Sequence, residues 1–192
     1  EIQASHERYG EDVLAAVARD GELAGVNVRT VLDKGAVSNR ITHHARHVDL
    51  VIMGLRGSTE DQFPGQGGSH LDQVLTRLLV PVLFVARGQS TISAIALGYD
   101  GSDGAARALK ATDLVADPLE VPVHAIYVSD DGDGGEVLDE CTELFPDLDV
   151  KKHVVKDDDP HTAMARTAVD AGANVLAVGF RGRSRLKDFL YG

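Results

Sequence analysis

A glycine pattern that occurs twice constrains the fold of this chain more than any other feature. The first copy opens with Gly-Leu-Arg-Gly at residues 54–57, and the second opens 125 positions later with Gly-Phe-Arg-Gly at residues 179–182. In each copy nine residues separate the second glycine from the next glycine of the pattern, Gly67 or Gly192. A repeat with a fixed period indicates that the chain holds two versions of one structural unit.

Each copy of the pattern follows a short apolar run, residues 50–53 or residues 175–178. A buried strand that enters a Gly-rich turn presents backbone N–H groups to an anion, usually a phosphate. Glycine suits this turn because it lets the N–H groups approach the anion without a Cβ clash. The arginine inside each loop, Arg56 or Arg181, can neutralise a phosphate and donate paired hydrogen bonds to it. The pattern therefore predicts a phosphate-binding loop after each of these two strands.

Apolar periodicity predicts helices and strands that alternate along the whole chain. We expect helices over residues 9–24, 37–48, 69–78, 105–115, 136–145 and 160–171, and strands over residues 26–32, 50–53, 80–86, 95–99, 121–128, 150–155 and 175–178. Short apolar strands separated by helices, without hairpin turns, indicate an α/β fold with an open parallel sheet and right-handed crossovers. Ligands of such sheets bind at the carboxyl ends of the strands, where the strand order reverses.

The glycine motif, the element order and one aspartate together resemble the universal stress protein family. The aspartate is Asp100, in the run Tyr-Asp-Gly-Ser at residues 99–102, where nucleotide-binding members of the family carry Asp followed by Gly-Ser. The resemblance implies an open five-stranded parallel sheet with helices on both faces, a Rossmann-like nucleotide-binding fold, present here as two tandem repeats. The first repeat, residues 1–88, would lack its first strands, and the second, residues 94–192, would lack its last helix and strand. We therefore interpret the sequence as an excerpt of a longer chain.

The resemblance also implies an adenine nucleotide as the ligand: ATP, or AMP or ADP, with Mg. In the second repeat Asp100 would face the adenosine, the strand end at Tyr127 and Val128 would contact the base, and the glycine loop would hold the ribose and phosphates. The candidate nucleotide-binding residues are Asp100, Ser102, Tyr127, Val128, Gly179, Arg181, Gly182 and Gly192 in the second repeat, and Gly54, Arg56, Gly57, Gly67, Gly68 and Ser69 in the first. Ser69 could bind phosphate or simply cap the helix that follows it. The alternative for the whole set is that the glycines only form a tight turn and the arginines are solvated.

Composition and charge narrow the class of protein. A net charge of −11 argues against nucleic-acid binding, because contacts to a phosphate backbone require a basic stripe. The predominance of Asp among the acids and Arg among the bases suggests a salt-adapted acidic surface like that of a halophile, with an ordinary acidic protein as the alternative. We see no membrane-spanning run and no signal peptide, and the single cysteine, Cys141, fits a reducing compartment. These features predict a cytoplasmic protein.

Motifs for catalysis and metal binding give no further candidates. The sequence contains no Gly-x-Ser-x-Gly, no HExxH and no Walker lysine, so we expect a weak ATPase at most and no catalytic residues. His43 and His47 share a helical face, but no Cys or Glu with ligand spacing lies near them, and we expect no metal site. His153 and His161 are interpreted as isolated, and Cys141 as a packing residue.

Two readings of the function remain beside nucleotide binding. The leading hypothesis is a stress-response or regulatory module that binds ATP. One alternative is a non-nucleotide interaction module, which would form a homodimer or pair its own two repeats through the edge strand predicted over residues 80–86. The other is a cytosolic regulatory domain of a membrane transporter, although this chain contains no membrane segment of its own.

Overall fold

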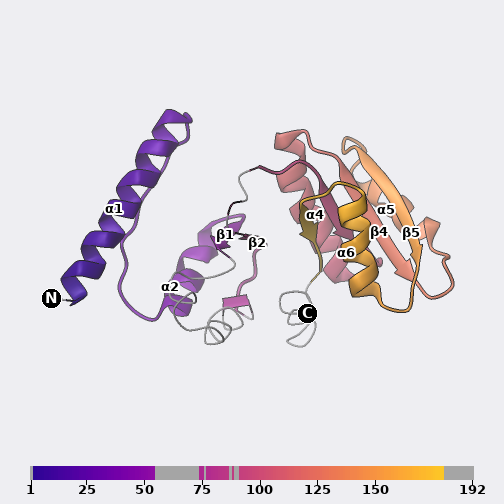
Figure 1. The fold of residues 1–192 in the computed structure, drawn as a ribbon, viewed down its shortest axis with the longest axis horizontal. Coiled ribbons are helices and arrows are strands. Elements are labelled where there is room, and N and C mark those ends of the chain that lie inside the picture. The colour runs from indigo at the N-terminus through magenta and orange to yellow at the C-terminus, as the bar shows by residue number, and fades with distance from the viewer. Residues whose placement is uncertain (1, 55–73, 76, 87, 89–90, 180–192) are drawn as a thin grey trace. The chain divides into compact units, whose positions relative to one another are not determined.

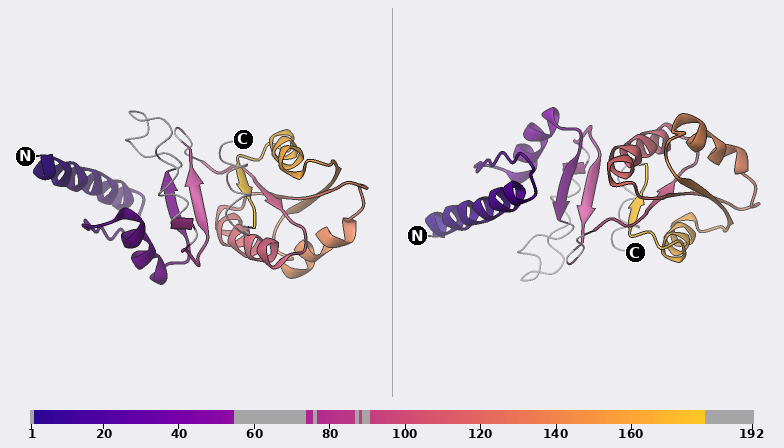
Figure 2. Two further views of the ribbon diagram at one scale, coloured as in Figure 1. Left: turned by 90° about the horizontal axis from the view of Figure 1, so that it is seen from below. Right: turned by 90° about the horizontal axis from the view of Figure 1, so that it is seen from above.

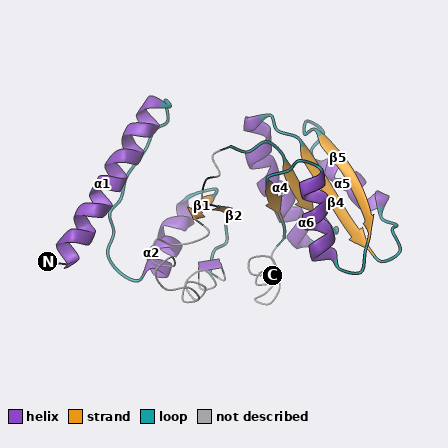
Figure 3. Ribbon diagram, in the orientation of Figure 1, coloured by secondary structure: helices purple, strands orange, loops and turns teal. Residues whose placement is uncertain are grey.

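A computed structural model describes residues 2–54, 74–75, 77–86, 88 and 91–179 of the chain (Figure 1). The helices are α1 (Ile2–Leu23), α2 (Val37–His44), the 3-10 helix η1 (Ala45–His47), α4 (Asp103–Leu119), α5 (Gly135–Leu144) and α6 (Pro160–Asp170). The strands are β1 (Val51–Gly54), β2 (Val82–Val85), β3 (Ile95–Gly98), β4 (Val123–Ser129), β5 (Val150–Lys156) and β6 (Val175–Ala177) (Figure 3). The chain divides into two compact units, residues 1–44 and residues 45–192.

The first unit consists of α1, α2 and the extended segment between them. This segment is tied to α1 by an ion pair in which Lys34 Nζ lies 2.7 Å from Glu7 Oε1. The strand predicted over residues 26–32 is wrong, because these residues form no strand in the structure. A strand needs a neighbouring backbone to satisfy its N–H and C=O groups, and the regular elements of this unit are both helices.

The second unit begins with a parallel pair of strands. β1 and β2 are in register from Val51 opposite Val82 to Gly54 opposite Val85. These two strands lie where the sequence predicts strands over residues 50–53 and 80–86. The helix predicted between them, over residues 69–78, falls mostly outside the described residues.

The remaining four strands form a parallel sheet in the order β5-β4-β3-β6. From β3 the chain adds β4 and β5 on one side, and it then returns to place β6 on the other side of β3. The strand order therefore reverses between β3 and β6. The α/β fold and the parallel pairing are confirmed, whereas five strands in one sheet and a tandem repeat are not.

Helices cover both faces of the four-stranded sheet: α4 and α5 lie on one side and α6 on the other (Figure 2). The core under α4 and α5 comprises Ile95, Leu97, Tyr99, Ala105, Ala108, Leu109, Ala116, Val123, Ala125, Leu138 and Cys141. The smaller core under α6 is formed by Ala96, Ile126 and Ala168. Cys141 is a packing residue as predicted, and burial raises the pKa of its thiol to about 11. Among the described helices, none combines the length and the apolar character needed to cross a membrane.

Candidate functional site

The ends of β3 and β6 bring two of the predicted site residues to one edge of the sheet. The two strands are in register from Ile95 opposite Val175 to Leu97 opposite Ala177. The same register, continued past the strand ends, sets Gly179 opposite the residue just before Asp100. Both residues therefore follow carboxyl ends of neighbouring strands, on either side of the point where the strand order reverses.

The turn after β3 is built by Asp100, Gly101 and Ser102. Asp100 Oδ1 accepts a hydrogen bond from the Ser102 backbone N–H at 3.0 Å. Gly101 has a φ of +72°, which glycine adopts without strain. The Ser102 hydroxyl oxygen in turn accepts from the Ala105 N–H at 3.2 Å and caps α4. The run Asp-Gly-Ser thus starts a helix and leaves the Asp100 side chain exposed at the sheet edge.

Gly179 packs against the first turn of α4. A Cβ atom at this position would lie 2.3 Å from the carbonyl carbon of Gly104 and 2.6 Å from the Ala105 nitrogen. No side chain fits there unless the backbone moves, so glycine is required at this position for packing. The chain that leaves β6 is thereby fixed beside the helix that Asp100 and Ser102 begin.

The end of β4 presents backbone groups to the same edge. The Tyr99 N–H donates to the Ile126 carbonyl oxygen at 3.0 Å, so the even-numbered residues of β4 direct their backbone N–H and C=O toward β3. Val128 lies two residues further along, past the last residue of β3. Its N–H and C=O therefore point into the space beyond the end of that strand.

Tyr127 has a different environment from Val128. Its half-buried side chain lies on the α4 and α5 face of the sheet, where it packs against the larger core. The backbone of Gly134 covers the ring so closely that a Cβ there would lie 2.1 Å from Tyr127 Cε1. The loop after β4 therefore holds the tyrosine in place.

The loops that follow β4 and β5 carry negative charge. The backbone N–H of Asp133 lowers the pKa of Asp131. The backbone N–H of Asp159, followed by the Arg166 guanidinium, lowers the pKa of Asp157. These carboxyl groups are ionised at neutral pH, and they oppose an anion near either loop.

Most of the predicted phosphate-loop residues lie outside the described part of the chain. These are Arg56, Gly57, Gly67, Gly68 and Ser69 of the first copy, and Arg181, Gly182 and Gly192 of the second. Gly54 is described as the exposed last residue of β1. The structure brings Asp100, Ser102, Val128 and Gly179 to one sheet edge, and the binding role of each stays a prediction.

Sequence reasoning misses a histidine pair. His124 Nδ1 lies 2.9 Å from His153 Nε2. The interpretation of His153 as isolated is therefore wrong, because the pairing of β4 with β5 brings it next to a residue 29 positions away. Aligning the two predicted strands as neighbours would have revealed the pair.

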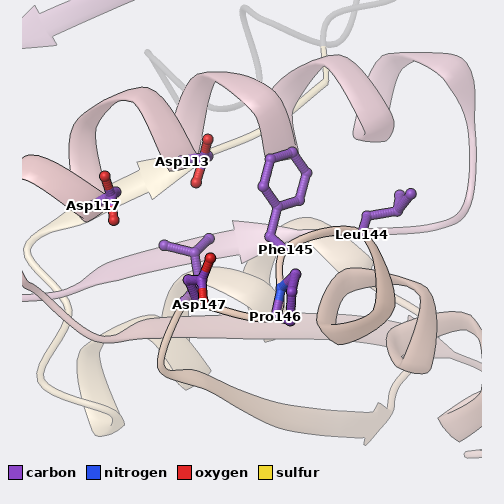
Figure 4. A pocket seen from close by; sticks show the side chains of 7 residues that line it. Asp113, Asp117, Leu144, Phe145, Pro146 and Asp147 are labelled. Atoms are coloured by element: carbon purple, nitrogen blue, oxygen red, sulfur yellow. The ribbon is translucent and has the colours of Figure 1, made fainter.

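A hollow of about 270 Å³ lies away from the candidate site (Figure 4). It is lined by Asp113 and Asp117 of α4 and by residues 144–148. The backbone carbonyl oxygen of Asp149, the residue that follows this segment, accepts a hydrogen bond from the N–H of Val123, the first residue of β4. The hollow therefore adjoins the amino end of that strand, opposite to the edge that carries Asp100.

Comparisons with known proteins agree with the fold. No family model matches the chain. A universal stress protein of Synechocystis sp. is 23% identical over 188 residues, which cover 94% of this chain and 64% of that protein. The crystal structure of a universal stress protein from Archaeoglobus fulgidus has a TM-score of 0.74 at 24% identity, over 98% of this chain and 71% of that one. A universal stress protein in complex with cAMP covers 54% of this chain and 86% of its own, at 21% identity and a TM-score of 0.40.

The chain is therefore similar to one universal stress protein in sequence and to another in fold. The chain spans 64% of the length of the curated relative.

Proposed function

We propose that this chain binds an adenine nucleotide at the carboxyl edge of the four-stranded sheet and acts through that binding as a stress-response or regulatory module. The ligand we propose is ATP, or ADP or AMP, with Mg. The observation that carries the proposal is the packing of Gly179 on α4, at the same sheet edge as Asp100. Doubly wound sheets bind their ligands at this kind of position, where the strand order reverses.

The adenosine would lie over the ends of β3 and β4. The exposed Asp100 carboxylate can accept hydrogen bonds from ribose hydroxyls or from an amino group. The Val128 backbone offers one donor and one acceptor beyond the end of β3, which suits the edge of a base. Adenine would thus be recognised mainly through hydrogen bonds to backbone groups.

The phosphates would extend toward the residues that follow Gly179 in the sequence. These residues include Arg181, Arg183 and Arg185, whose side chains can pair with phosphate oxygens. The ionised carboxylates after β4 and β5 disfavour the opposite orientation. Phosphate contacts would order the glycine loop and shift the population of the conformation that carries the signal.

Isothermal titration of the full chain with ATP, ADP, AMP and cAMP, with and without Mg²⁺, tests this function. The informative variant is Asp100→Asn, because its amide oxygen can still accept from the Ser102 N–H and keep the turn. We expect the variant to bind ATP at least about tenfold more weakly, roughly 1.4 kcal/mol.

The matched control is Asp113→Asn, which makes the same chemical change beside the hollow at the other end of the sheet. It should leave the affinity for ATP unchanged. Absence of saturable binding at millimolar nucleotide would contradict the function, and an equal loss in both variants would contradict the site.

We also propose that the chain forms a homodimer or pairs its repeats through β2. This strand pairs with β1 along one side, and no further strand pairs with it among the described residues. A sheet edge of this kind offers unpaired N–H and C=O groups to a partner strand. We expect a mass of twice 20.4 kDa by sedimentation equilibrium, and a single-chain mass would contradict the homodimer.

A further inference from the structure

We propose that His124 and His153 form an acid-sensitive link between β4 and the edge strand β5. The register sets Lys151 opposite His124 and His153 opposite Ile126, so the two histidines are diagonal neighbours on the α6 face of the sheet. Their ring nitrogens are 2.9 Å apart, and the rings are stacked with centroids 5.1 Å apart. His124 is buried, with 6% of its surface exposed.

The hydrogen bond between His124 and His153 requires one ring nitrogen that carries no proton. A neutral imidazole has one N–H donor and one acceptor nitrogen, so a hydrogen bond between two rings needs the accepting nitrogen without a proton. When both rings are fully protonated, two N–H groups face each other and two positive charges lie side by side. The hydrogen bond is then replaced by repulsion between β4 and β5.

The surroundings of His124 also resist its protonation. Burial, followed by the charges of His153 and Lys151, lowers the pKa of His124, while Asp149 acts in the opposite direction. On the same face of the sheet, α6 and β3 contribute the uncharged side chains Met164, Ala168 and Ala96 to the smaller core. The unfolded chain therefore binds a proton at His124 more readily than the folded chain does. The contribution of His124 to the free energy of unfolding is complete above the ordinary histidine pKa, and it is lost as the pH falls toward the lowered pKa of the folded state.

β5 is the element that such a change would loosen. It lies at the edge of the sheet, where its only neighbouring strand among the described ones is β4. The ladder between them runs from Val123 opposite Val150 to Ser129 opposite Lys156, and the histidine pair spans its first half. Acid should therefore increase opening of β5 before the rest of the sheet is affected.

Hydrogen exchange and thermal unfolding of the full chain at pH 7.5 and pH 5.0 test the link. In the parent, we expect peptides covering residues 150–156 to lose protection at pH 5.0, after correction for the intrinsic exchange rate. The variant His153→Gln retains a hydrogen-bonding amide that does not titrate. Its melting temperature should fall by about 4 °C less than that of the parent between the two pH values.

The control variant is His47→Gln, because His47 is exposed and lies in η1. It should respond to acid as the parent does. The proposal is overturned if His153→Gln loses as much stability and β5 protection as the parent. If that variant fails to fold, side-chain NMR of the parent decides, since the pKa of His124 must then lie below the ordinary histidine value of about 6.5.

Discussion

Replacing Gly134 with alanine is expected to destabilise the four-stranded sheet domain by about 3 kcal/mol, since two separate costs add. Gly134 has a φ of +142°, which an L side chain rarely adopts. In addition, the new Cβ would lie 2.1 Å from Tyr127 Cε1 and 2.2 Å from Tyr127 Cδ1. The ring must then leave its position against the core, and the end of β4 moves with it. Urea unfolding followed by far-UV circular dichroism measures the loss.

The neighbouring glycine supplies the control. Gly135 is the first residue of α5, and a Cβ there would meet nothing within 4 Å. Gly135→Ala should therefore be neutral or stabilise the domain by up to about 1 kcal/mol. Equal unfolding midpoints for the two variants would contradict the placement of Tyr127 under this loop.

A double variant separates the two costs of Gly134→Ala. Measured in the background of Tyr127→Ala, the substitution meets no aromatic ring, and only the backbone cost remains. We expect its effect to fall to about 1–2 kcal/mol. An unchanged effect would show that the backbone alone is responsible.

Local signals explain why the sequence predicts much of this fold. The pair Asp159-Pro160 indicates the start of a helix, and in the structure Asp159 Oδ1 accepts from the N–H groups of His161 and Thr162 at 3.2 and 3.3 Å. The strand predicted over residues 121–128 is observed as Val123–Ser129. Such features depend on neighbouring residues, which the sequence lists in order.

Features that depend on distant residues are missed or wrong. The segment over residues 26–32 alternates like a strand, but pairing decides whether a strand forms. Gly134 and Gly135 are adjacent glycines with the same apparent role, and the backbone φ of Gly134 and the position of Tyr127 distinguish them. For the candidate site, the sequence predicts which residues follow the strand ends, and it does not predict that Gly179 touches α4.

Gly179→Ala is expected to cost about 3 kcal/mol, and this substitution bears most directly on the proposed site. The atoms that its Cβ would meet, at 2.3 to 2.6 Å, all belong to the backbone of Gly104 and Ala105. A backbone in the first turn of a capped helix cannot rotate away as a side chain can. Either α4 shifts or the end of the chain segment after β6 is pushed outward, and both changes move Gly179 and Asp100 apart.

Gly98→Ala is the matched comparison at the end of the neighbouring strand. Its Cβ would lie 2.6 Å from Met164 Sδ and 2.8 Å from Met164 Cε, the far end of a flexible side chain. Methionine can adopt another rotamer, so we expect a cost of about 1 kcal/mol. Shortening the side chain with Met164→Val should remove most of that cost, whereas no side-chain substitution should rescue Gly179→Ala.

The two variants should also differ in nucleotide binding under conditions where both are folded. Gly98→Ala should keep the affinity of the parent for ATP, because the side chain that must move to make room for its Cβ, Met164, lies on the α6 face. Gly179→Ala should lose more than about tenfold, since it displaces the start of the loop that would hold the phosphates. If Gly179→Ala is as stable as the parent and binds ATP equally well, the contact between the end of β6 and α4 does not form the site, and the proposed function loses the observation that carries it.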